Sequence, residues 1–439
     1  MLRDLIRRSF WLAGGAAAGR LLPLAILLLA SRRMETLQFA SASAAYAWAG
    51  VAMSLTSAGL ATVMTQRLAA TTDGVVQARL FAHHVRLSIA WSGLLAVAVL
   101  VFGEPASARL FGAALDPAVL LPAALSGALW SQVVVCVAAL NGCHRARAAS
   151  AALAVCGLLQ GAGIGMALHF FGPDAQASAW GLCIGSALAC FFAVLLLRRA
   201  LPIQAWRGAS GAATPLAHPA LPLWRNPVLW STAAAAGAAP VSFFAGSLIA
   251  HGSGGGRQLA QYFALEQVHQ LLVYLPAIVG QALLPLIGRR IGHTSSGRQR
   301  ARLLRRVALV AAGAALVGLL IGAASSAHVG WFVALLGNPA LGLDDAWSIR
   351  WMVLSAALAL SLSITGGAFL GSGHIVAAGL FNLTWSAAFI GLTVLLSAQG
   401  NEGLQAARFM ASAALATAAV LTLLIWAARE PTASQGALP

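Results

Sequence analysis

A polar stripe within one apolar segment, predicted as a helix over 259–287, holds the residues best suited to chemistry. Tyr262, Glu266, His269 and Tyr274 recur at helical spacing and therefore share one face. Glu266 is the only acid well inside a predicted apolar segment, and such acids usually pair with a cation, relay protons or bind a cation. His269 could share a proton with Glu266 near neutral pH. The stripe predicts an ion- or proton-coupling site at Glu266 and His269, the alternative being hydrogen bonds to neighbouring helices.

Arg20 is a second charge inside an apolar segment, near the middle of the one over 9–31. A charge at that depth is unfavourable unless it faces protein, water or a counter-ion. One arrangement is a structural ion pair with a carboxylate such as Glu266, and the other places Arg20 on the wall of a hydrated cavity. We expect the cavity, and we predict Arg20 as a binding residue in it.

Arg350 and Arg408 lie close to the ends of two later apolar segments. Long cationic side chains at such positions commonly extend to the membrane interface and keep their charge in water, which accounts for both residues. The alternative is that Arg350 and Arg408 contribute to a binding site together with Arg20 and Tyr262.

The sequence contains no catalytic or metal-binding motif. It has no HExxH pair, no Walker loop, no GxSxG elbow and no cluster of His, Cys and acids with ligand spacing. Its five cysteines lie within or at the ends of apolar segments, which indicates packing rather than a disulfide framework or a metal site. We therefore expect a protein that is not an enzyme and that uses no metal or other cofactor.

Composition identifies the environment of these residues as a membrane. The chain has 439 residues, of which 60% are hydrophobic and 9% are charged, and its mean hydropathy is +0.83. Soluble domains have about a quarter of their residues charged. We predict an all-α polytopic membrane protein with about twelve apolar helices of spanning length. These are expected over 9–31, 38–65, 82–102, 117–140, 148–171, 177–197, 227–250, 259–287, 304–335 (with a re-entry into the interface), 347–370, 374–398 and 404–427.

The connections between the segments alternate in charge. All 27 basic residues are arginine, and most of them gather in every second connection, whereas acids gather in the others. By the positive-inside rule both termini face the cytoplasm. The pair Arg32 and Arg33 is the exception, because it would face outward. Since topology accounts for most of the net charge of +16, we expect no nucleic-acid binding.

The stretch over 201–226 reads as a linker between two halves, because it contains four prolines among Gly, Ser and Ala. We expect a six-helix lobe over 1–200, a second over 227–428, and a cytoplasmic tail over 429–439. A faint repeat agrees with this division: Phe39 to Arg67 has the spacing of Tyr262 to Arg290, and LNGCH, ending at His144, matches LGSGH, ending at His374. Repeats of this kind with a substrate path between them are common in transporters.

The densest group of arginines lies between Arg289 and Arg306. Guanidinium groups at that density could hold a pyrophosphate or an anionic lipid head group. Topology alone would also place them there.

Three segments resemble a known family. QFASASAAYAWAGVAMSLTSAGLATVMTQRLAA, Gln38–Ala70, resembles helix two of the polysaccharide flippases of the multidrug/oligosaccharidyl-lipid/polysaccharide exporter superfamily. QYFALEQVHQLLVYLPAIVGQALLPLIGRR, Gln261–Arg290, is similar to helix eight of that family, and FLGSGHIVAAGLFN, Phe369–Asn382, to its turn from helix ten into eleven. One departure is Phe39-Ala40, where the family usually has an aromatic-Gly pair.

The resemblance implies a flippase of the bacterial cytoplasmic membrane that works by alternating access. A polyprenyl-pyrophosphate-linked oligosaccharide would cross between the lobes while its prenyl tail stays in lipid. Arg20 would contact phosphate or sugar, and Glu266 with His269 would bind H+ or Na+. Membrane lipids and a polysaccharide polymerase with other assembly proteins are the implied partners.

Two other functions compete with this one. A cation-coupled drug or metabolite exporter of the same superfamily would use Glu266 as its coupling acid, although such exporters often carry more intramembrane acids in the first lobe. A membrane enzyme acting on lipid-linked sugars would need a large polar outward loop, whereas the longest outward segment, roughly 325–345, is mostly apolar.

Overall fold

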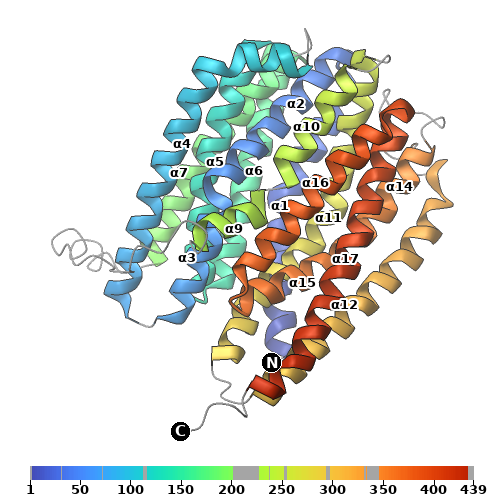
Figure 1. The fold of residues 1–439 in the computed structure, drawn as a ribbon. Coiled ribbons are helices and arrows are strands. Elements are labelled where there is room, and N and C mark those ends of the chain that lie inside the picture. Colours follow the sequence, from blue (N-terminus) through green and yellow to red (C-terminus); the bar gives the residue numbers. More distant parts are fainter. Residues whose placement is uncertain are drawn as a thin grey trace.

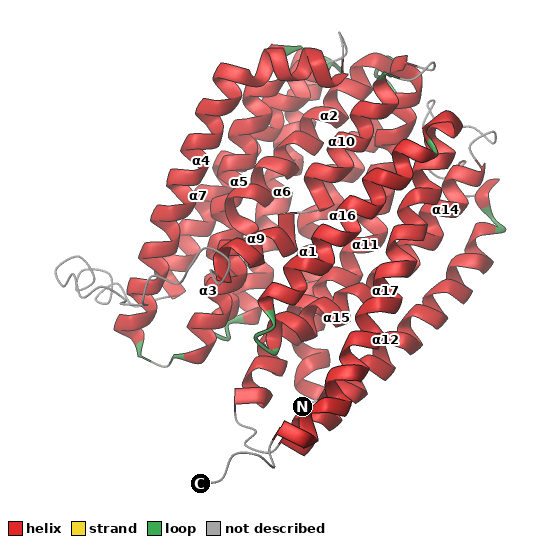
Figure 2. Cartoon of the chain, viewed as in Figure 1, coloured by secondary structure: helices red, strands yellow, loops and turns green. Residues whose placement is uncertain are grey.

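The computed structural model describes residues 2–30, 32–71, 73–111, 116–200, 227–236, 238–251, 255–292, 297–330, 333 and 346–433. Nearly all of these residues are helical, and no strand occurs among them (Figure 2). The expected linker over 201–226 lies outside the described residues, as do residues 334–345 and 434–439.

The helices of the N-terminal half follow the first six predicted segments. They are α1 (Leu2–Ala30), α2 (Thr36–Met53), a π-helical turn (Ser54–Ala58), α3 (Gly59–Ala70), α4 (Gly74–Phe111), α5 (Pro117–Gly142), α6 (Ala146–Phe171) and α7 (Ala175–Ala200). Acidic side chains fix several helix starts by accepting from orphan backbone N–H groups. Asp116 accepts from Ala118 ahead of α5, and Asp174 accepts from Ala177 at the start of α7.

The helices of the C-terminal half follow the other six segments. They are α9 (Pro227–Ala236), α10 (Ala238–Ala250), α11 (Gly255–Gly292), α12 (Gly297–Ser326), α14 (Ala346–Ala357), α15 (Ala359–Gly371), α16 (Ile375–Leu395), a short 3-10 turn (Ser397–Gln399) and α17 (Gly400–Ala433). α17 runs to Ala433 and so includes the first five residues of the expected tail.

Three helices begin seven or eight residues earlier than predicted. α1 begins at Leu2 instead of 9, α4 at Gly74 instead of 82, and α12 at Gly297 instead of 304. The arginines expected ahead of them therefore lie on helices. Arginine is a good helix former, so charge alone did not mark the helix boundaries.

The helices form one long bundle in which α1 begins and α17 ends at the same end (Figure 1). In the N-terminal half α6 packs on α1 and α7, and α5 packs on α2, α4 and α7. In the C-terminal half α11 packs on α15, and α17 packs on α12 and α14. The halves meet where α11 contacts α1 and α2, and where α3 contacts α9. α11 is thus the central wall between the two halves.

The bundle has the lengths and surface of a multi-pass membrane protein. Eight helical segments of the described chain are long and apolar enough to cross a bilayer, or nine if the pair around the π-helical turn, bent by 43°, forms one span. Large apolar side chains on their outer faces are exposed, including Phe171 (77%), Phe191 (66%) and Leu320 (63%). Such faces are suited to lipid rather than to water.

One turn recurs in both halves with the same backbone hydrogen bonds. N–H groups of three successive residues bond to carbonyls four, three and five residues earlier, at Cys143, His144 and Arg145 after α5, and at Ser372, Gly373 and His374 after α15. The middle residue is left-handed in both, with φ of 60° at His144 and 83° at Gly373. The two turns are therefore equivalent, but His144 corresponds to Gly373 and not, as the sequence comparison predicted, to His374.

Candidate functional site

A cavity of about 460 Å³ lies between the two halves at the middle of α11. Both halves contribute to its wall, which combines aromatic rings, amides and hydroxyls with apolar surface. Its polar and aromatic lining residues are Tyr46, Ser54, Ser126, Trp130, Gln160, Ser242, Tyr262, Glu266, His269, Gln270, Tyr274, Ser355, Ser363, Thr365, Asn382, Trp385, Arg408 and Ser412.

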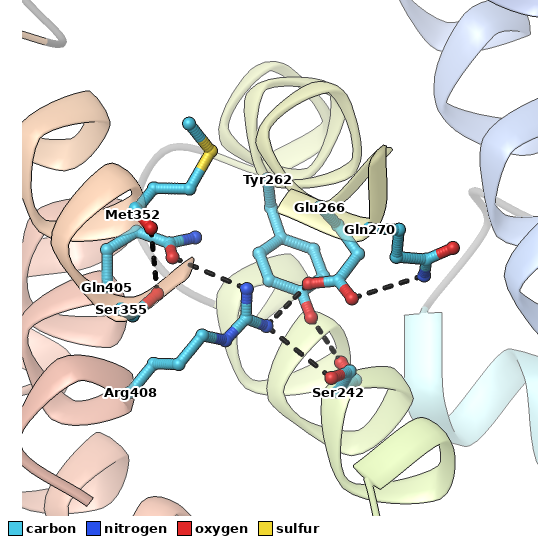
Figure 3. Close-up of polar contacts among 8 residues, drawn as sticks. All are labelled: Ser242, Tyr262, Glu266, Gln270, Met352, Ser355, Gln405 and Arg408. Carbon is cyan, nitrogen blue, oxygen red and sulfur yellow. Dashed lines mark hydrogen bonds and ion pairs between the residues drawn. The ribbon is translucent and has the colours of Figure 1, made fainter. Parts of the chain in front are cut away.

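An ion pair joins two helices on the C-terminal side of this cavity (Figure 3). Nη2 of Arg408 on α17 lies 2.5 Å from Oε2 of Glu266 on α11. The side chains are only 1% and 8% exposed. Breaking a buried pair of this kind by removing one partner leaves an uncompensated charge, which is far more costly than losing a surface salt bridge. The pair therefore fixes α17 against α11.

Further polar groups surround the pair. Gln270 donates to the second carboxylate oxygen of Glu266 at 3.2 Å, while Arg408 donates to Ser242 Oγ and to Gln405 Oε1, each at 3.4 Å. The phenol of Tyr262 donates to the backbone carbonyl of Ser242 (Figure 3). These hydrogen bonds provide partners for most polar atoms of the pair. Because the pair contains one negative and one positive charge, the site is close to neutral.

The guanidinium of Arg408 also lies over the ring of Phe389, with Cζ 5.2 Å from the ring centroid. This cation-π contact adds to the attraction of the carboxylate. Nε of Arg408 is buried and has no hydrogen-bond partner among the described residues.

The N-terminal side of the cavity is polar but carries no charge among its described residues. Ser126 and Ser186 share a hydrogen bond of 2.8 Å, and Gln160 donates to Ser186 at 2.9 Å. α2 contributes Ser54, whose hydroxyl donates to the carbonyl of Gly50 at 2.8 Å. Ser54 begins the π-helical turn, and π-turns within α-helices are frequent at functional sites.

Within the described part of the chain, two side-chain hydrogen bonds cross between the halves. Gln267 Nε2 on α11 donates to Ser43 Oγ on α2 at 2.8 Å, and both side chains are buried. Gln66 Nε2 on α3 donates to the carbonyl of Leu370 on α15 at 3.0 Å. The first bond joins α11 to α2 and the second joins α3 to α15, so the halves are joined at two separate places.

The structure brings four of the predicted binding and coupling residues together. Tyr262, Glu266, His269 and Arg408 all line the cavity. Arg408 is buried, so the expectation that it reaches the interface as a solvated cation is wrong. The reason is its partner: a carboxylate on α11 meets it across the bundle, and the sequence alone does not show that contact.

The structure does not place the other two predicted binding residues in the cavity. Arg350 does not line the cavity, and its guanidinium lies over Trp347, with Cζ 4.7 Å from the ring centroid. Arg20 lies on α1, but its side chain is outside the described part of the structure. The carboxylate considered as its partner, Glu266, is paired with Arg408 instead.

A second polar stripe, on α17, was missed in the sequence. Asn401, Gln405, Arg408 and Ser412 recur at helical spacing, and each is 6% exposed or less. The same periodicity that indicated the stripe on α11 would have identified this one. Within the described residues no three His, Cys, Asp or Glu side chains group as a metal site requires.

Comparison with solved structures places this arrangement in a known fold. An inward-facing multidrug resistance MATE family transporter of the MOP superfamily aligns over 98% of this chain and 96% of its own, with a TM-score of 0.65 at 14% identity. An outward-facing one aligns over 99% and 96%, with a TM-score of 0.63 at 16% identity. A Pyrococcus furiosus MOP superfamily transporter, described as having a binding pocket of reversed polarity that suggests a different function, aligns over 99% and 96%, with a TM-score of 0.67 at 14% identity.

No protein-family model matches the sequence, and no curated protein matches it. The chain therefore has the fold of the MATE transporters of the MOP superfamily, at an identity too low to carry over what those proteins bind.

Proposed function

We propose that this protein moves a polyprenyl-pyrophosphate-linked oligosaccharide across the bacterial cytoplasmic membrane by alternating access. The observation that carries the proposal is the ion pair between Glu266 and Arg408. Glu266 is the only carboxylate among the described lining residues, and the pair neutralises it. A cavity of this kind offers little to a cationic drug, whereas it suits a large uncharged oligosaccharide whose linked pyrophosphate lies away from the pair.

The lining supports a sugar ligand in a second way. Gln160, Gln270 and Asn382 supply amides that can both donate to and accept from hydroxyl groups. Trp130 and Trp385 supply flat apolar faces on opposite halves of the molecule. Binding sites of this composition, apolar with a few convergent polar groups, orient a ligand without a strong electrostatic demand.

The fold supports the transport mode. Solved relatives of this fold are known in inward-facing and outward-facing conformations. A pyrophosphate head group cannot cross about 30 Å of hydrocarbon unaided, so it needs a polar path between the halves. Arg20 on α1, a helix that packs on α11, remains our proposed phosphate contact.

The test is a reconstitution in liposomes with a fluorescent polyprenyl-pyrophosphate oligosaccharide in one leaflet. Flipping exposes the label to a membrane-impermeant quencher, and empty liposomes give the background. We expect flipping by the wild type and a loss of at least about tenfold in Arg20→Gln, whose uncharged amide cannot form a bidentate phosphate contact. Wild-type rates equal to those of empty liposomes would refute the proposal.

The second candidate is a cation-coupled drug or metabolite exporter. It is favoured by the position of His269 in the cavity, three residues after Glu266 on α11, and by the multidrug transporters that share the fold. The same liposomes, loaded with ethidium and given a proton or sodium gradient, distinguish the two. Gradient-driven ethidium transport without flipping would establish the exporter, with Glu266 and His269 as its coupling site.

A further inference from the structure

The first three turns of α12 carry the densest described group of arginines in the protein. Arg298, Arg302, Arg305 and Arg306 are exposed, and Arg300 is half-buried. We call the four exposed residues the α12 arginine face. The beginning of α12 lies at the same end of the bundle as the start of α1 and the end of α17 (Figure 1).

The α12 arginine face continues directly into the lipid-facing side of the same helix. Arg302 is followed at seven-residue intervals by Leu309 and Leu316, whose exposed fractions are 59% and 62%. Arg306 is followed four residues later by Val310, which is 60% exposed. Residues four and seven apart share one face of a helix. The buried residues of α12 lie on its other side: Ala301, Leu304, Ala308, Ala311 and Gly322.

The alignment of the α12 arginine face with the apolar side of the same helix determines the depth of the arginines in the membrane. When the exposed Leu309 and Val310 contact hydrocarbon, the arginines one to two turns before them, roughly 6–10 Å along the axis, lie at the depth of the head groups. The four side chains point outward from the bundle toward lipid, because they share the exposed face. Charges that only set topology need no such alignment and can lie in any loop.

The stability of α12 does not explain the arginine face. Cations near a helix N-terminus are repelled by the partial positive charge of the helix dipole. None of the four exposed arginines forms an ion pair within the described part of the chain.

We propose that the α12 arginine face binds the phosphate groups of anionic phospholipids, such as phosphatidylglycerol or cardiolipin, in the leaflet at the arginine-rich end of the bundle. Arginine forms bidentate, charge-assisted hydrogen bonds with phosphate, and juxtamembrane clusters of basic residues are attracted to anionic lipid. The acyl chains would lie along the exposed apolar side of α12. This site is separate from the central cavity and does not depend on the proposed function.

The experiment uses the full chain purified in neutral detergent and mixed with micelles containing phosphatidylglycerol or phosphatidylcholine. Native mass spectrometry counts the retained lipid, and thermal unfolding records the stabilisation. The test variant is R298Q/R302Q/R305Q/R306Q. The matched control is R145Q/R147Q/R198Q/R199Q, which removes four exposed arginines from the same end of the N-terminal half.

We expect the wild type and the control to retain phosphatidylglycerol in preference to phosphatidylcholine, and the test variant to bind it at least about tenfold more weakly. Equal losses in both variants would refute the proposal in favour of a general charge effect, and so would equal retention of the two lipids by the wild type. If the test variant does not fold, the salt dependence of the wild type provides the test. Salt at about 0.5 M strongly screens exposed charges. Retention of phosphatidylglycerol that this salt leaves unchanged would therefore refute a phosphate contact at an exposed face.

Discussion

Arg408 on α17 lies 2.5 Å from Glu266 on α11, so the buried acid of the central cavity is paired with a cation from the last helix of the protein. The contact joins residues 142 positions apart in the sequence. It turns what the sequence presents as a free intramembrane acid into half of a neutral pair. Any role of Glu266 in coupling therefore requires that this pair open or exchange partners.

Removal of Arg408 should destabilise the protein strongly. Arg408→Gln leaves Glu266 buried without its cation, and losses for broken buried pairs are about 3–5 kcal/mol. The double variant E266Q/R408Q removes both charges, and we expect it to recover most of that loss. Thermal unfolding of the purified variants measures both effects. A double variant as unstable as Arg408→Gln would show that the pairing energy is not the cause.

Locking the contact between Ser43 and Gln267 should stop transport. These side chains join α2 to α11 across the two halves, and alternating access requires relative movement of the halves. With the five native cysteines replaced, S43C/Q267C is treated with a short bifunctional thiol reagent. We expect flipping to fall to background and to return after reduction.

The control for this cross-link lies within one half. Ser126 and Ser186 are hydrogen-bonded on α5 and α7 of the N-terminal half, so S126C/S186C joins helices that move together. Full inhibition by this second cross-link as well would contradict the role assigned to the Ser43–Gln267 contact.

Close packing of α1 on α6 depends on a glycine. A Cβ added at Gly157 would lie 2.5 Å from the backbone carbon of Gly19, well inside van der Waals contact. We expect Gly157→Ala to cost about 1–3 kcal/mol. At Gly165, on the same helix, an added Cβ would meet one atom at 3.9 Å, so Gly165→Ala should be neutral or stabilising by up to about 1 kcal/mol. Thermal unfolding compares the two, and equal effects would contradict the packing argument.

Substitution of Arg350 should leave transport unchanged. Its guanidinium lies over Trp347 and not in the cavity. We expect Arg350→Gln to flip lipid-linked oligosaccharide at the wild-type rate and to lose about 0.5–1 kcal/mol of stability with the cation-π contact. The liposome assay measures the rate, and a loss of flipping would show that Arg350 takes part in substrate binding.

Local patterns in the sequence predicted much of the helical architecture. Apolar runs of spanning length identify the helices because each satisfies its own backbone hydrogen bonds. The turn after α5 shows where such patterns fail. The similarity of LNGCH to LGSGH located a real equivalence, but aligned it one residue away from the pairing of His144 with Gly373. Backbone conformation, not side-chain identity, is shared there.

The sequence by itself determined the membrane environment, the helical class and the polar stripe of α11, since composition and periodicity are properties of single segments. It did not determine which charges pair. Glu266 could meet Arg20, Arg350 or Arg408, and only the packing of α17 on α11 selects Arg408. Arg350, on α14, lies over Trp347 instead. Tertiary structure decides such choices because the cost of a buried charge depends on the atoms around it, and those come from distant parts of the chain.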